Sequence, residues 1–145
     1  MADYTSQMEA ARKGIGTPQM KIVAEKEHMD VEALRELMAK GEVIIPCNKK
    51  HTSLNPSGVG AKLTTKINVN LGVSRDWKDV DMEYEKVRSA VEMGAEAIMD
   101  LSSYGDTRTF RRKLTSDCPA MIGTVPIYLA LAQVADHSSH PRWEL

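Results

Sequence analysis

The feature that most constrains this chain is a regular alternation of short apolar segments with amphipathic ones, which starts at Leu63. Three segments have the composition of strands, and each precedes a segment of helix length. The strand segments are TKINVNLG, AEAIMDLSS and AMIGTVP, and the helical ones are VDMEYEKVRSAVEMG, DTRTFRRKLTSD and IYLALAQVA. Strands separated by helical segments of about 10 to 15 residues are typical of βαβ units around a parallel sheet. The sequence therefore predicts an α/β fold.

Two architectures contain such a sheet, an open doubly wound sheet and a closed (β/α)8 barrel. A complete barrel needs roughly 250 residues, and this chain has 145. We expect a partial (β/α)8 barrel of the TIM type, preceded by an amino-terminal helical segment. The open sheet stays as the alternative that the pattern allows.

The first part of the chain carries helix boundary signals in place of that alternation. Gly14 and Gly16 end a first helix, and Pro18 opens a second. Asp30 caps a third helix, which ends at Gly41. These signals predict three short helices.

A short β-branched run, EVIIPCN, predicts a strand after these helices, and KKHTSLNPSGVGAK predicts a long polar loop. We expect three parts along the chain. They are a helical segment with one short strand and the long loop over 1–62, the first β/α units of a barrel over 63–135, and an irregular tail over 136–145.

Composition narrows the classes of partner. Nineteen basic and twenty acidic residues leave a net charge of -1, which gives no overall field to attract nucleic acid or a membrane surface. Since no run of about 18 apolar residues occurs and the start is polar, we expect neither a membrane span nor a signal peptide, and a cytoplasmic location. Cys47 and Cys118 lie too far apart for a metal knuckle, and the histidines show no ligand spacing, so we expect no metal site in this chain.

In parallel α/β folds the active site lies at the carboxyl ends of the strands, and the three predicted strands end in polar residues. Asn68 and Asn70 are two apart and should share one face of their strand. An amide both donates and accepts hydrogen bonds, which suits a neutral heterocycle or a ribose. The alternative is that each asparagine only caps the loop.

The next two strand ends add further candidates. Met99 is either a core residue or a contact for an aromatic ring, and Asp100 must be paired by donors or act as a ligand or base. Ser102 follows as a pocket-lining candidate, and Tyr128 opens a helix directly after GTVP, either reaching over the sheet or anchoring the helix. FRRK at 110–113 is interpreted as a solvated helix face.

Taken in order, five segments resemble the phosphomethylpyrimidine synthase family. QMEAARKGIGTPQM, VIIPCN, KINVNLG, GAEAIMDLSS and IGTVPIY are similar to its ARKG-I-TP-M, IIPAN, KINANIG, GAD-VMDLST and IGTVPIY elements, over residues 7 to about 128. The resemblance implies that Asn70, Met99 and Tyr128 contact an imidazole ribonucleotide. These three residues are spaced 29 apart, a regularity that suits one contact per successive strand. No catalytic residue is assigned.

The resemblance also implies the chemistry of the family. Its members use S-adenosylmethionine and a 4Fe-4S cluster to form a radical that rearranges 5-aminoimidazole ribonucleotide, a carbon–carbon lyase reaction, and they act as homodimers. The product is 5-hydroxybenzimidazole, the lower ligand of cobamides, or hydroxymethylpyrimidine phosphate, for thiamin. The stretch NKKHTSLNPSGVGAKLTTKINVNLGVS is more similar to the 5-hydroxybenzimidazole branch.

Departures from the family limit what this chain should do alone. The CxxCxxxxC motif that holds the cluster is absent, as are the later substrate-binding elements, and Cys47 and Val69 replace alanines. We therefore expect a fragment of the enzyme that is inactive by itself. Two other classes stay open: a non-catalytic α/β binding or assembly module, and a hydrolase or aldolase that uses Asp100 as base near Lys66.

Overall fold

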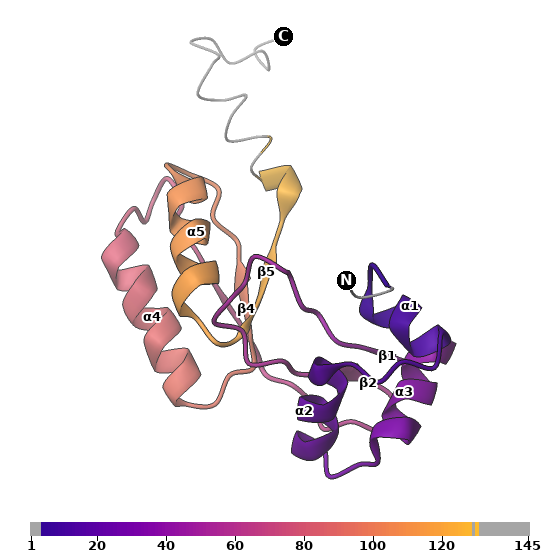
Figure 1. Cartoon of the computed structure of the whole chain (residues 1–145). Coiled ribbons are helices and arrows are strands. Elements are labelled where there is room, and N and C mark those ends of the chain that lie inside the picture. Colours follow the sequence, from indigo (N-terminus) through magenta and orange to yellow (C-terminus); the bar gives the residue numbers. More distant parts are fainter. Residues whose placement is uncertain (1–3, 129, 131–145) are drawn as a thin grey trace, which may run out of the picture. The chain divides into compact units, whose positions relative to one another are not determined.

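The structure is a computed structural model that describes residues 4–128 and residue 130. The chain divides between Lys66 and Ile67 into two compact units, which are described separately below (Figure 1). The predicted tail over 136–145 and most of the predicted helix IYLALAQVA lie outside the described residues.

Unit 1 opens with three short helices, as the boundary signals predict. Ser6, Thr17 and Asp30 cap them, and each side chain accepts a hydrogen bond from a backbone N–H of the first turn. Gly41 ends the third helix in the left-handed conformation, with φ 80°. The helices are α1 (Gln7–Arg12), α2 (Pro18–Lys26) and α3 (Val31–Lys40).

Two very short strands complete unit 1. β1 (Val43–Ile44) lies in the predicted strand and pairs antiparallel with β2 (Val59–Gly60). The loop prediction was wrong at β2, because two residues with no apolar run of their own become a strand only by pairing with a distant segment. Gly60 is needed there, since its φ is 145° and a Cβ would lie 2.2 Å from the carbonyl oxygen of Glu42.

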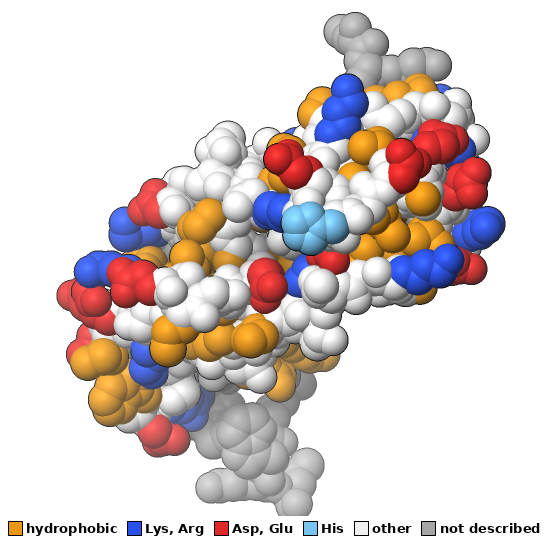
Figure 2. Space-filling model, turned by 90° about the horizontal axis from the view of Figure 1, so that it is seen from below, with side chains coloured by type: hydrophobic (Ala, Val, Ile, Leu, Met, Phe, Trp, Pro, Cys, Tyr) orange, Lys and Arg blue, Asp and Glu red, His pale blue; other side chains and the backbone are white. Residues whose placement is uncertain are grey.

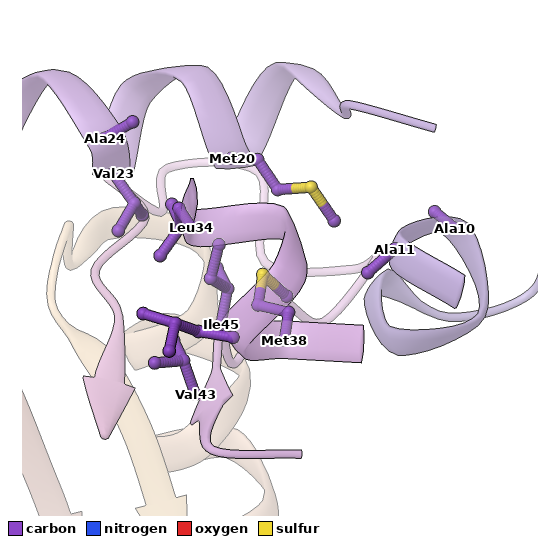
Figure 3. Close-up of a cluster of buried hydrophobic side chains, with 10 residues drawn as sticks. Ala10, Ala11, Met20, Val23, Ala24, Leu34, Met38, Val43 and Ile45 are labelled. Atoms are coloured by element: carbon purple, nitrogen blue, oxygen red, sulfur yellow. The ribbon is translucent and has the colours of Figure 1, made fainter. Parts of the chain in front are cut away.

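The core of unit 1 is built from aliphatic side chains and methionines, with no aromatic ring at its centre (Figure 3). Met20 and Val23 come from α2, Leu34 and Met38 from α3, and Val43 from β1, and all are at most 2% exposed. Burial of side chains of this size stabilises a fold by about 1.5–3 kcal/mol each. Unit 1 therefore has an apolar core made by its own elements.

Unit 2 is an α/β layer built on one small parallel sheet. Its strands lie in the order β3-β4-β5, and both neighbouring pairs are parallel. A helix connects each strand to the next, as the alternation predicts. The elements are β3 (Asn68–Leu71), α4 (Val80–Glu92), β4 (Ala97–Asp100), α5 (Thr107–Asp117) and β5 (Met121–Thr124).

Both connecting helices pack on the same face of this sheet (Figure 1). Ile98 of β4 is fully buried there, against Val87 of α4 and Leu114 of α5. The rings of Tyr84 and Phe110 join the two helices with their centroids 4.9 Å apart. This helix-covered face holds the apolar core of unit 2, so the other face of the strands is the one to examine for function.

Candidate functional site

The register of the sheet brings two of the predicted site residues side by side. Asn70 of β3 pairs with Met99 of β4, and Met99 pairs with Gly123 of β5. Residues in register on neighbouring parallel strands present their side chains to the same face. We call this the asparagine face. Asn70 and Met99 both lie one residue before the carboxyl ends of their strands.

Asn68 belongs to the same face, as strand alternation predicts. Its Nδ2 donates to Oδ1 of Asn70 over 2.9 Å, and both residues are exposed. This bond uses Oδ1 of Asn70 as the acceptor, so the Nδ2 group of Asn70 can donate to another partner. The pair therefore presents an oriented amide beside Met99.

Met99 lies across Gly123, where no side chain competes for the space. A Cβ built on Gly123 would lie 2.8 Å from Cε and 2.9 Å from Sδ of Met99. The glycine therefore lets the thioether lie low over β5. A polarisable group in this position can contact the flat side of an aromatic ligand.

Tyr128 lies in the helical segment that follows β5, and it is 40% exposed. Its backbone N–H donates to the carbonyl oxygen of Val125 over 3.1 Å, which fixes the first turn of that segment. The structure thus places Tyr128 after the carboxyl end of β5, on the same edge of the sheet as Asn70 and Met99. Its role stays a prediction.

Asp100 and Ser102 are separate from the asparagine face. Asp100 lies on the helix-covered face, is 0% exposed, and accepts from Nε of Arg111 over 2.5 Å and from the N–H of Ser102 over 2.8 Å. The interpretation of FRRK as a solvated face was wrong for Phe110 and Arg111, because Phe110 enters the core and Arg111 pairs with Asp100.

Lys66 is also committed to an ion pair. Its Nζ lies 2.6 Å from Oε1 of Glu27, and the two side chains are 8% and 4% exposed. Burial acts to raise the pKa of Glu27, but the hydrogen bonds from Lys66 and Thr64 outweigh it, so the pKa is lowered. Lys66 and Asp100 are thus each ion-paired within their own unit, and these contacts give the hydrolase or aldolase hypothesis no support.

Sequence reasoning missed one buried acid next to the site. Glu83 of α4 is 0% exposed, and its Oε2 accepts from the N–H of Gly72, two residues after Asn70. The signal was present in the sequence. Glu83 lies four residues before Val87 and seven before Ala90, so it occupies the buried stripe of α4, where a carboxylate needs a reason.

The implied cluster can be tested against the side chains at hand. A radical-generating 4Fe-4S cluster needs three cysteine thiolates, and the sequence has Cys47 and Cys118 alone, one in each unit. Burial raises the pKa of the Cys118 thiol. Within 4–128 and 130, no three His, Cys, Asp or Glu side chains gather where they could hold a metal ion. The residues described do not fit the cluster.

Two surface properties bear on partners. On the face drawn in Figure 2, basic and acidic side chains are interspersed, with no broad patch of one sign. In the part of the chain that the structure describes, no helix combines the length and the apolar character needed to cross a membrane.

Comparisons with known proteins agree with the sequence resemblance. The model of the radical SAM ThiC family matches residues 6–143. The phosphomethylpyrimidine synthase of Alkaliphilus oremlandii is 63% identical over 128 residues, which are 88% of this chain and 29% of the relative. Those of Clostridioides difficile and Clostridium kluyveri are 62% and 60% identical over 129 residues, 89% of this chain and 30% of each relative. The chain thus spans about 30% of the length of the curated relatives it matches.

Proposed function

The chain belongs to the radical SAM ThiC family, and from that premise we propose that it supplies part of the pocket for 5-aminoimidazole ribonucleotide in an enzyme of the phosphomethylpyrimidine synthase type. The carbon–carbon lyase reaction belongs to the proposal for the full family sequence. Because this chain spans about 30% of its relatives and its described residues hold no cluster ligands, its own part is substrate binding, and we expect no turnover from it alone.

One observation carries the proposal, the adjacent placement of Asn70 and Met99 at the carboxyl ends of neighbouring parallel strands. The amide can donate to and accept from the polar edge of an aminoimidazole, and the thioether can lie against its ring. Tyr128 is the third contact that we propose, from the segment after β5.

We also propose that β3, β4 and β5 are consecutive strands of a β/α barrel. The strands lie in sequence order, and α4 and α5 cover the same face. This is the arrangement of consecutive β/α units in a barrel, where all the helices lie outside; three strands of one half of an open sheet share it. The asparagine face would then point into the barrel.

The identity of the product is the most specific part of the proposal. The relatives reported above all have the name phosphomethylpyrimidine synthase, which favours hydroxymethylpyrimidine phosphate. The similarity of residues 48–74 to the other branch keeps 5-hydroxybenzimidazole as the second product. Mass spectrometry of the products of a full-length protein that carries this sequence would distinguish the two.

Calorimetric titration of the chain with 5-aminoimidazole ribonucleotide tests the proposed pocket. Loss of one hydrogen bond is worth about 0.5–1.5 kcal/mol, so Asn70→Ala should weaken binding by about two- to twelvefold, and Tyr128→Phe should weaken it as well. Asn55→Ala, an exposed asparagine of unit 1, is the matched control and should bind like the parent chain. Unchanged affinity in both Asn70→Ala and Tyr128→Phe would contradict the proposal.

The second candidate function is an assembly module. In the described sheet β3 and β5 are the edge strands, and unpaired strand edges invite pairing with another chain. Sedimentation over a range of concentrations tests this function. Dimerisation without affinity for the nucleotide would favour the assembly module, whereas nucleotide binding favours the pocket. Dimerisation together with nucleotide binding agrees with the homodimer that the family resemblance implies.

A further inference from the structure

The segment that follows β3 is held by two buried side chains from other elements. The N–H of Gly72 donates to Oε2 of Glu83 over 2.8 Å, and the N–H of Val73 donates to Oγ of Ser102 over 3.1 Å. Both acceptor residues are 0% exposed. Ser103 adds a bond from its N–H to the carbonyl oxygen of Val73 over 3.0 Å. The chain just beyond Asn70 is therefore fixed on both sides.

Packing alone does not explain why a glutamate occupies position 83. A carboxylate with no exposure is costly to bury, and an apolar side chain there would pack against the same core. An apolar residue would leave the N–H of Gly72 without an acceptor, which costs about 1–3 kcal/mol. Oε1 of Glu83 lies 2.5 Å from Nζ of Lys86, whose side chain is 47% exposed, so the acid is paired toward the surface.

Gly72 shows how closely the segment must run beside the end of β4. Its φ is 144°, and a Cβ there would lie 2.5 Å from the backbone nitrogen of Ser102. The backbone at the end of β3 is therefore packed directly against the backbone that follows β4, and Glu83 holds Gly72 in this place. Asn70 is two residues away and next to Met99.

We propose that Glu83 is a positioning residue of the nucleotide pocket: acting through Gly72, its carboxylate fixes Asn70 beside Met99. This inference rests on the proposed function, in which Asn70 and Met99 contact the ligand. Glu83 itself touches no ligand, because it lies on the helix-covered side of the sheet.

The structure offers a matched control for this role. Oε2 of Glu96 accepts from the N–H of Ile67 over 2.8 Å, at the opposite end of β3. Glu83→Ala and Glu96→Ala therefore remove the same kind of bond from the two ends of one strand. Glu83→Gln keeps an oxygen that can accept from Gly72, so it should rescue the position of Asn70.

The test is an NMR comparison of the full chain labelled with 15N and with 13C in the methionine methyl groups. In Glu83→Ala we expect amide exchange at Gly72 to speed up by about tenfold, the equivalent of one lost hydrogen bond. We also expect shifts of the Asn70 side-chain amide and the Met99 methyl signals. Glu96→Ala should leave those two signals in place, and Glu83→Gln should largely restore them.

Faster exchange at Gly72 with unmoved Asn70 and Met99 signals in Glu83→Ala would overturn the inference, since Glu83 would then only stabilise the fold. If Glu83→Ala does not fold, Glu83→Asp, whose shorter side chain withdraws the acceptor from Gly72, is judged by the same two signals.

Titration with 5-aminoimidazole ribonucleotide separates the two proposals. If Asn70→Ala loses affinity while Glu83→Ala keeps the wild-type value, the inference fails and the proposed function stands. If the wild-type chain does not bind, the proposed function fails, and the NMR signals alone then decide whether Glu83 fixes Asn70. Weaker binding in Glu83→Ala with rescue in Glu83→Gln supports both.

Discussion

The two faces of the β3-β4-β5 sheet differ in chemistry although the same strands form them. On the helix-covered face the strands contribute apolar side chains, from Val69, Leu71, Ile98 and Ile122, together with the buried Asp100 and, at the end of β5, the exposed Thr124. The asparagine face carries two amides, two thioethers and two small residues, from Asn68, Asn70, Ala97, Met99, Met121 and Gly123. Consecutive residues of one strand thus serve opposite tasks, and a shift of one residue in register would exchange them.

The largest effect that follows from this difference should come from Asp100→Ala on the helix-covered face. Removal of one partner of a buried ion pair typically costs about 3–5 kcal/mol. Nη2 of Arg111 already lacks a hydrogen-bond partner within the described residues, so nothing nearby can compensate. Urea unfolding followed by circular dichroism measures the free energy of unfolding. Asp100→Asn keeps an acceptor for the N–H of Ser102 and should lose less. An Asp100→Ala chain as stable as wild type would contradict the pairing.

A neighbouring pair of residues compares the faces directly. Ile98 is 0% exposed and Met99 is half-buried on the other side. Ile98→Ala should lower the free energy of unfolding by about 2–5 kcal/mol, as for other large-to-small changes in a core. Met99→Ala should cost clearly less stability, but it should weaken nucleotide binding. Ile98→Ala, where it still folds, should change nucleotide binding less. Equal losses of stability in the two variants would remove the distinction between the faces.

Substitutions of two glycines extend the comparison between the faces, with smaller expected losses of stability. A Cβ at Gly72 would meet backbone at 2.5 Å with φ at 144°, whereas a Cβ at Gly123 would meet the flexible end of Met99. Gly72→Ala should destabilise by about 1–3 kcal/mol or more, as for other strained backbone positions. Gly123→Ala should change stability little and displace the Met99 methyl group. Thermal unfolding and the methionine methyl NMR signals measure the two effects, and a Gly123→Ala chain with an unmoved methyl signal would contradict the placement of Met99.

Local sequence signals were enough to predict much of this arrangement. The first-turn proline Pro18, the cap at Asp30 and the stop at Gly41 act within a few residues of themselves, so they set helix boundaries that the structure confirms. Alternation in KINVNLG placed Asn68 and Asn70 on one face for the same reason. Sequence signals that act over a few residues can therefore be interpreted without a structure.

What the sequence hid depends on contacts between elements. β2 is a strand only because it pairs with β1, and Arg111 is drawn to a half-buried position only because Asp100 lies opposite it, 11 residues earlier. Glu83 reaches Gly72 over the same separation. The composition of FRRK is the same in a solvated and in a paired helix, so composition could not decide between the two. For Glu83, its place in the apolar stripe of α4 indicated burial but not the partner that it holds.

The smallest effect we expect concerns the helix that covers the sheet. Asp106 caps α5, and hydrogen bonds from the Thr109 side chain and backbone hold the pKa of its carboxyl below the ordinary value of 3.8. A carboxyl whose pKa is lower in the folded state stabilises the fold above its unfolded pKa, and that stabilisation is lost as the pH falls through the folded value. Wild type should therefore lose stability faster than Asp106→Ala as the pH falls below the ordinary value of 3.8, measured by thermal unfolding at each pH. The other carboxyls with lowered pKa, such as Glu27 and Asp117, are the same in both chains, so the difference isolates Asp106.

Thr109→Val should raise the pKa of Asp106 in a carbon-detected NMR titration. Parallel pH curves for wild type and Asp106→Ala would show that this cap adds nothing to the helix-covered face.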